Sequence, residues 1–194
     1  MARALRKDAA ERRRAILAAA SHAFAEQGYN VPLDVIADRA GVGRATLYRN
    51  FADRSTLALA VFETQLQELA TLTRARGDDP QVFFWFIDRL ADLLARNAGL
   101  DTAMREARDT DALGPIRLGL IEAGGEALER TKAAGLIRAD LGQQDIRAIA
   151  MILGAGANRP TADEKDVFGR RIRALLLDGL RVRPVLPADE TILA

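Results

Sequence analysis

Residues 35–51 have the sequence VIADRAGVGRATLYRNF, in which two segments with helical spacing of apolar residues flank Gly41. Two helices that cross at such a turn need a small residue at the crossing and a turn residue that can take a positive φ. Ala37 and Gly41 meet these two requirements, and Val42 would fill the angle between the helices. The stretch therefore predicts a helix-turn-helix.

The second of these helices is predicted to start near Gly43 or Arg44 and to carry a polar face with no core to cover. Leu47 and Phe51 lie four residues apart, so both would hold the helix from behind. The side chains left on the outer surface are those of Arg44, Thr46, Tyr48, Arg49 and Asn50. A helix with such a face fits the major groove of duplex DNA, where it can contact base edges and phosphates.

The whole chain is predicted to be all-α, with about nine helices, because apolar residues recur at helical spacing and strand-like alternation is absent. The first helix would end at Gly28, and Asp53 and Asp79 are expected N-caps of later helices. The helices after the first are predicted over residues 32–40, 44–50, 55–74, 80–97, 101–107, 112–134, 143–156 and 163–181.

Charge is distributed unevenly along the 194 residues. Residues 1–60 hold ten Lys and Arg against six Asp and Glu, whereas the remainder is slightly acidic and the net charge is +1. A basic end favours a polyanionic partner such as nucleic acid, although a solvated charged face is an equally open interpretation. No apolar run is long enough to cross a bilayer, and the N-terminus is too charged for a signal peptide, so a cytoplasmic protein is expected.

No catalytic residue, metal site or cofactor is predicted. The absence of cysteine excludes disulfides, thiolate nucleophiles and cysteine-based metal sites. His22, the one histidine, has no second histidine or carboxylate at ligand spacing and is interpreted as a surface residue.

Further residues extend the pattern on both sides of the turn. They are Ile16-Leu17-Ala18-Ala19-Ala20, Phe24, Gly28-Tyr29, Ile36-Ala37, Ala40-Gly41-Val42, Thr46-Leu47-Tyr48, Phe51 and Leu57. With these residues, the segment 12–62 resembles the DNA-binding domain of the TetR family of bacterial repressors. Two departures are Val31-Pro32, where many members have Ser or Thr that caps the helix and binds a phosphate, and Gly43, which replaces a frequent serine cap.

The resemblance implies that residues 44–50 form the recognition helix. Thr46, Tyr48 and Arg54 would then contact the DNA backbone. Arg49 and then Arg44 would lie nearest the bases, because arginine can donate two hydrogen bonds to guanine. Ala45 would permit close approach or touch a thymine methyl group.

The resemblance also implies a C-terminal helical domain that binds an effector and dimerises. We therefore expect a DNA-binding domain at 1–54, an effector and dimerisation domain at 55–182 and a flexible tail at 183–194. The pocket would lie among the helices at 58–74, 80–97, 101–107 and 112–134. Trp85, Met104 and Ile121 are the candidate ligand contacts.

The predicted function is that of a homodimeric repressor that binds a pseudo-palindromic operator in double-stranded DNA and is released by a small molecule. The last two helices carry more apolar surface than one small core needs, so they are expected to form the dimer. The alternatives are a ligand-independent regulator and a helical enzyme with an appended helix-turn-helix.

Three features keep two interpretations each. The aromatic run at residues 83–86 would line a cavity or form core. Arg105 and Arg108 would meet an acidic ligand or pair with neighbouring carboxylates. The basic residues at 3–7 are expected to precede the first helix, as an arm along the DNA or as a tail without defined contacts.

Overall fold

The computed structural model describes residues 2–97, 99–107, 113–157 and 162–182. These residues form nine helices and no strand, and one isolated antiparallel bridge joins Ile137 to Arg181. The all-α prediction is confirmed. In chain order the helices are α1 (Ala2–Gln27), α2 (Leu33–Arg39), α3 (Arg44–Asn50), α4 (Arg54–Ala75), α5 (Val82–Arg96), α6 (Leu100–Glu106), α7 (Gly114–Ala133), α8 (Gln143–Ala157) and α9 (Ala162–Leu180).

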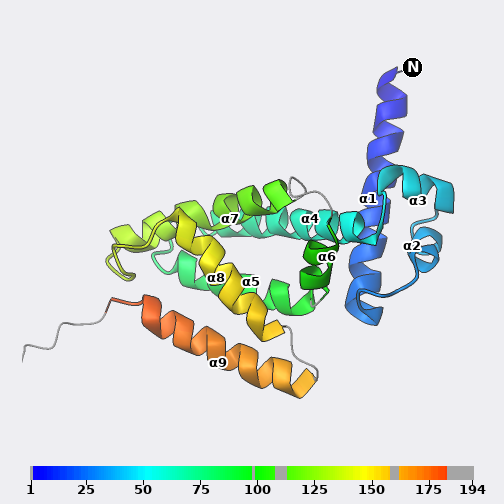
Figure 1. Cartoon of the computed structure of the whole chain (residues 1–194). Helices are drawn as coiled ribbons and strands as arrows, with labels where there is room; N and C mark the ends of the chain where they lie inside the picture. Colours follow the sequence, from blue (N-terminus) through cyan, green and yellow to red (C-terminus); the bar gives the residue numbers. More distant parts are fainter. Residues whose placement is uncertain (1, 98, 108–112, 158–161, 183–194) are drawn as a thin grey trace, which may run out of the picture.

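A small N-terminal core holds α1, α2 and α3 against the first turns of α4 (Figure 1). Ile16 and Ala20 of α1 are fully buried, as their spacing predicts. Leu57 and Val61 of α4 belong to the same core, so α4 is shared between this unit and the rest of the molecule. The domain boundary predicted between residues 54 and 55 falls where α4 begins.

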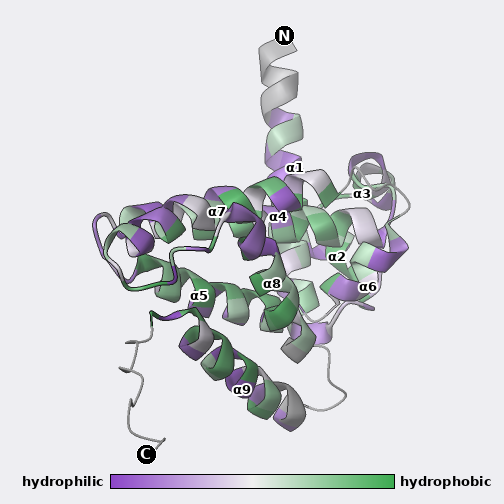
Figure 2. Ribbon diagram, turned by 60° about the vertical axis from the view of Figure 1, so that its left-hand side comes forward, coloured by the Kyte–Doolittle hydropathy of each residue, from purple (hydrophilic) through white to green (hydrophobic). Residues whose placement is uncertain are grey.

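The larger core lies among α4, α5, α7, α8 and α9, with α9 at the edge of the body (Figure 1). Helix α5 is hydrophobic over most of its length (Figure 2). Such a helix is stable when it is buried on several sides, as α5 is in this core. A Cβ atom at Gly124 of α7 would lie 2.6 Å from the ring of Phe86, so glycine lets α5 and α7 approach closely. Within the described residues, no helix combines the length and apolarity needed to span a membrane.

Most helix boundaries differ from the sequence prediction by one or two residues, and two helix starts change its interpretation. Helix α1 already begins at Ala2, so the basic segment expected to precede it as an arm is helical. Helix α5 begins at Val82 rather than at Pro80. Asp79 caps the preceding turn instead: its carboxylate accepts hydrogen bonds from the Gln81 backbone N–H at 2.9 Å and from the Arg76 guanidinium. These bonds stabilise the ionised form and hold the pKa of Asp79 below its ordinary value.

Candidate nucleic-acid interface

The turn between α2 and α3 has the geometry that its sequence predicts. Gly41 has a φ of +67°, a left-handed conformation that strains any side chain with a Cβ atom. The N–H of Gly41 donates to the Asp38 carbonyl at 3.1 Å, and the N–H of Val42 donates to the Ala37 carbonyl at 3.0 Å. The chain thus reverses tightly, and α3 starts at a fixed angle to α2.

Helix α3 is held from behind by two anchors. Leu47 and Phe51 are each only 1% exposed. From α1, the guanidinium of Arg13 lies 4.4 Å from the centre of the Phe51 ring and donates to the Asn50 carbonyl at 3.3 Å. Neither Pro32 before α2 nor Gly43 before α3 caps its helix through a side chain, so the missing Ser/Thr caps are not replaced at those two positions.

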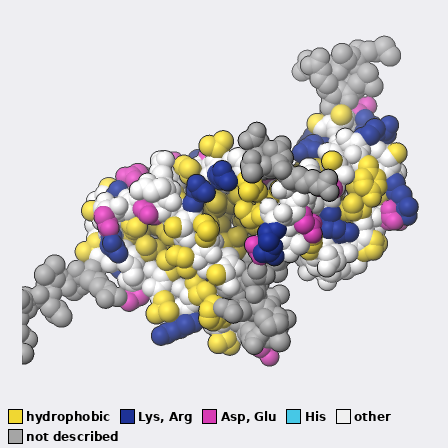
Figure 3. Space-filling model, viewed as in Figure 1, with side chains coloured by type: hydrophobic (Ala, Val, Ile, Leu, Met, Phe, Trp, Pro, Cys, Tyr) yellow, Lys and Arg dark blue, Asp and Glu magenta, His cyan; other side chains and the backbone are white. Residues whose placement is uncertain are grey.

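The opposite face of α3 is open to solvent. Arg44, Ala45 and Arg49 are exposed, and Tyr48 is 51% exposed although it is aromatic. Thr46 and Asn50 are half-buried, and both form hydrogen bonds within α3. Arg49 Nη2 donates to Thr46 Oγ1 at 3.1 Å, and Asn50 Nδ2 donates to the Thr46 carbonyl at 2.8 Å. Several arginine side chains lie over this N-terminal part of the surface (Figure 3).

Arg44 pairs with Asp34 of α2. The Arg44 side chain nevertheless remains 71% exposed. Exposed ion pairs contribute about 0–1 kcal/mol, so Arg44 can exchange this carboxylate for a group on a bound partner at little cost. Asp34 thus holds one of the two arginines predicted to contact bases.

Arg54 ties the start of α4 to the loop between α1 and α2. Its Nη1 atom donates to the Tyr29 carbonyl at 2.6 Å and also to the Val31 carbonyl, and its guanidinium lies 5.7 Å from the centre of the Tyr29 ring. Arg54 is half-buried. The guanidinium thus positions the helix-turn-helix, and its contact with a phosphate stays a prediction.

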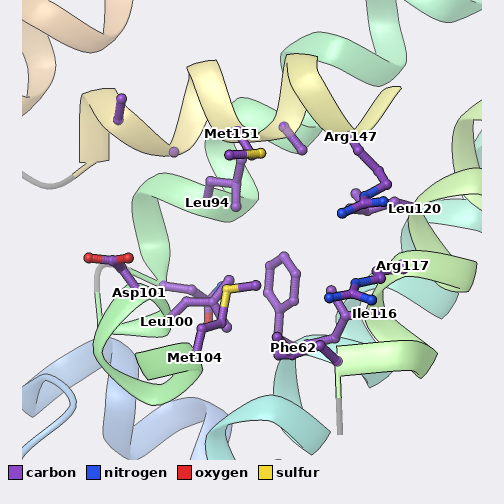
Figure 4. A pocket seen from close by; sticks show the side chains of 15 residues that line it. Phe62, Leu94, Leu100, Asp101, Met104, Ile116, Arg117, Leu120, Arg147 and Met151 are labelled. Atoms are coloured by element: carbon purple, nitrogen blue, oxygen red, sulfur yellow. The ribbon is translucent and has the colours of Figure 1, made fainter. Parts of the chain in front are cut away.

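A cavity of about 410 Å³ lies in the C-terminal body, between α4, α5, α6, α7 and α8 (Figure 4). Its lining is mostly apolar, with polar groups contributed by Asn97, Asp101, Arg117 and Arg147. The apolar lining residues are Phe62, Leu94, Leu100, Met104, Leu113, Ile116, Leu120, Ala150, Met151, Gly154 and Ala155. This volume falls in the range of small-molecule sites.

Among the three candidate ligand contacts, Met104 lines the cavity, whereas Trp85 and Ile121 are not among the lining residues. Trp85 lies under the Arg76 guanidinium at 4.9 Å. Phe83, Phe84 and Phe86 are buried core side chains, which favours the core interpretation of the aromatic run.

The structure agrees with the surface interpretation of His22 and with the pairing interpretation of Arg105. Arg105 pairs with Asp101 one turn away, and Arg108 lies outside the described residues. His22 is exposed.

Helix α6 connects the cavity to the N-terminal unit through Tyr29. The Tyr29 hydroxyl donates to Glu106 Oε2 at 2.6 Å, at the C-terminal end of α6. At the other end of the helix, a Cβ atom at Gly99 would lie 2.2 Å from the Tyr29 Cβ, so only glycine allows this approach. Burial, then the hydrogen bond and charge of Glu106, raises the pKa of Tyr29 above its ordinary value and keeps the hydroxyl protonated.

A second connection runs through hydrogen bonds between α1, α4 and the end of α5. Gln65 Nε2 donates to Ser21 Oγ at 3.0 Å, while Gln65 Oε1 accepts from Asn97 Nδ2 at 2.9 Å. Asn97 is itself a lining residue of the cavity. Contacts thus run from cavity-lining helices to the N-terminal unit at two places, Tyr29 and Gln65.

Several of these residues were absent from the sequence prediction. The polar pattern of α2 alone does not indicate that Asp34 meets Arg44, since the pair forms across the turn. Tyr29 was recognised only as part of a family pattern, and nothing near it in sequence indicates Glu106, 77 residues later. Arg117 and Arg147 lie 30 residues apart on different helices and carry no local motif.

Comparisons with known proteins agree with this geometry. Residues 16–61 match the family described as bacterial regulatory proteins, tetR family, and residues 78–182 match the SbtR-like C-terminal domain of transcriptional regulators. Among solved structures, a TetR transcription regulatory protein from Mycobacterium vanbaalenii is 30% identical over 92% of this chain and 99% of that chain, with a TM-score of 0.60. The TetR regulator SCO0520 from Streptomyces coelicolor is 31% identical over 89% and 99%, also with a TM-score of 0.60.

Curated relatives match over shorter stretches of the chain. The transcriptional activator FasR of Mycolicibacterium smegmatis is 42% identical over 65 residues, which are 33% of this chain and 30% of FasR. The regulator SAB2452 of Staphylococcus aureus is 38% identical over 76 residues, 39% of this chain and 41% of that protein. The matched segments thus span less than half of the curated relatives. The predicted class, a regulator rather than an enzyme, is confirmed, because the chain belongs to the TetR family of bacterial transcriptional regulators.

Proposed function

We propose that the chain represses transcription as a homodimer that binds a pseudo-palindromic operator and leaves it when a small molecule occupies the cavity. The observation that carries the DNA-binding part is the solvent-facing side of α3, backed by buried Leu47 and Phe51. The division into a DNA-binding domain at 1–54 and an effector domain at 55–182 belongs to this proposal, as does a cytoplasmic location. The predicted tail at 183–194 lies outside the described residues.

In the proposed complex α3 lies in the major groove. Arg49 and Arg44 contact base edges, where each bidentate arginine–guanine contact discriminates by about 1–3 kcal/mol. Thr46, Tyr48 and Asn50 lie against the DNA backbone and orient the helix. The short side chain of Ala45 allows the helix to approach the bases.

The homodimer is proposed to form through α8 and α9. Both helices expose large apolar side chains, namely Met151, Ile152, Val167, Phe168 and Leu175. A two-fold axis between two copies would bury these side chains and place two α3 helices about 34 Å apart, on successive major grooves. Sedimentation of a monomer at micromolar concentration would contradict this arrangement.

Release is proposed to be a population shift that reaches the DNA through α6. A ligand in the cavity contacts Leu100 and Met104, and both ends of the same helix touch Tyr29. A ligand that prefers one position of α6 thereby changes the orientation of the helix-turn-helix. Coupling free energies of this kind are typically about 1–3 kcal/mol.

The test is selection of random DNA duplexes on the purified protein, followed by titration of the recovered sequence at several salt concentrations. We expect a pseudo-palindrome and an affinity that falls as salt rises, because phosphate contacts release counterions. Arg49→Ala should weaken binding about tenfold to a hundredfold and relax the preference at one base position. Arg138→Ala, which changes charge equally at an exposed site paired with Asp140, is the control. Recovery of no preferred sequence would refute the proposal.

A further inference from the structure

Two arginines that have no hydrogen-bond or ion-pair partner among the described residues face the same cavity. Arg117 projects from α7 and Arg147 from α8, and their guanidinium groups lie at one end of the cavity (Figure 4). Neither forms a hydrogen bond or an ion pair with any described residue. Two cations that converge from separate helices, with no carboxylate of the described chain bound to them, leave a site for a negative group.

Other arginines on α7 and on the neighbouring α6 do have carboxylate partners. Arg130 of α7 pairs with Glu126, and Arg105 of α6 pairs with Asp101. Asp101 is the one carboxylate among the described lining residues, and in Figure 4 it lies across the cavity from the two arginines. Asp101 pairs with Arg105, on the side of the cavity away from Arg117 and Arg147.

The rest of the cavity is suited to a hydrocarbon body. Phe62, Leu94 and Met151 lie between the arginines and the far side in Figure 4, with Leu100 and Met104 below. A fitting ligand would place its apolar atoms against these side chains and a carboxylate on the guanidinium groups. Arginine binds carboxylates through charge-assisted, often bidentate hydrogen bonds. A cationic ligand would instead meet two like charges.

We propose that the effector of this protein is an amphipathic carboxylate, with its head on Arg117 and Arg147 and its aliphatic or aryl body among the apolar side chains. The regulatory role of this ligand rests on the proposed function, whereas its binding to the cavity can be measured without DNA. Both arginines are exposed, so the head lies near solvent and the affinity depends on salt concentration.

The experiment measures direct binding by calorimetry, without DNA. The probes are octanoate and 4-phenylbutyrate, which distinguish an aliphatic from an aryl body, with 1-octanol, 4-phenylbutanol and octylamine as neutral and cationic counterparts. Each carboxylate should bind at least tenfold more tightly than its alcohol, and octylamine should bind more weakly than 1-octanol. Arg117→Gln and Arg147→Gln should each reduce carboxylate affinity about tenfold and leave alcohol affinity unchanged.

Arg89→Gln is the matched control, because it removes the same charge from an exposed arginine that pairs with Asp92 and does not line the cavity. Thermal unfolding followed by the fluorescence of Trp85 checks that each variant is folded. Equal affinity for carboxylates and alcohols, absence of binding by both carboxylates, or unchanged carboxylate affinity in both glutamine variants would overturn the inference.

A separate titration of the selected operator distinguishes this inference from the proposed function. Carboxylate binding that depends on the two arginines but does not change operator affinity would support the ligand assignment and refute ligand-controlled release. Operator release by a ligand that binds equally to the wild type and to both glutamine variants would support ligand-controlled release and refute the ligand assignment.

Discussion

The N-terminal unit and the C-terminal body are both helical and share α4, yet their functional surfaces arise differently. The candidate DNA-binding face lies on one helix of seven residues, and its anchors and exposed side chains alternate within that short segment. The cavity collects side chains from five helices between Phe62 and Ala155. Separate family models match the two regions, one over residues 16–61 and the other over residues 78–182.

The difference indicates how much each region depends on distant contacts. A face on one helix is specified by the order of residues along it, because the helical period places them. A cavity between helices depends on how several elements pack, and each lining residue is placed by contacts far away in sequence. The predictions below test whether the two regions are separable.

The largest effect is expected for Phe51→Ala. Loss of a fully buried phenylalanine should destabilise the N-terminal core by about 3–5 kcal/mol and abolish operator binding. Trp85, the single tryptophan, reports on the C-terminal body, so the free energy of unfolding measured in urea by its fluorescence should change little although operator binding is lost. A fall of the full amount, about 3–5 kcal/mol, in the Trp85 measurement would show that the two cores unfold as one cooperative unit.

Arg54→Gln should have the next largest effect. Loss of the bonds to the Tyr29 and Val31 carbonyls should lower the free energy of unfolding by about 1.5–3 kcal/mol. If the rest of the guanidinium also binds a phosphate, the slope of log affinity against log salt should fall by about one per protomer. A loss of stability with an unchanged slope would restrict Arg54 to its internal role.

Tyr29→Phe tests the link between the regions. The variant keeps the ring against Gly99 but loses the hydrogen bond to Glu106, which should cost about 0.5–1.5 kcal/mol. Amide hydrogen exchange should increase in α6, while α3 should remain protected. Unchanged exchange in α6 would show that ring packing alone holds this helix.

Asp34→Asn should produce the smallest effect and, unlike the others, a gain. Removal of the carboxylate that pairs with Arg44 should raise operator affinity by up to about fivefold, because an exposed pair contributes up to about 1 kcal/mol. Fluorescence anisotropy of labelled operator measures the change. Weaker binding would indicate that Asp34 positions Arg44 for its contact.

Helix positions and the helix-turn-helix could be predicted because their signals are local. Gly28 and Gly41 end their helices in left-handed conformations, and Asp53 accepts a hydrogen bond from the Thr56 N–H at 2.8 Å, as a predicted N-cap should. The predicted start of α5 was wrong by two residues, because the Asp79 carboxylate binds Arg76 in the turn before the helix. An aspartate followed by proline is expected both at a helix N-cap and in such a turn, so the sequence does not distinguish the two.

The sequence by itself determined the all-α fold, the helix-turn-helix and the outer face of α3, since helical periodicity and glycine conformation act within a few residues. Only the tertiary structure decided that Arg117 and Arg147 face one cavity, that Tyr29 meets both ends of α6 and that Asp34 holds Arg44. These contacts join residues that are distant along the chain, and their formation depends on the packing of whole helices rather than on any local pattern.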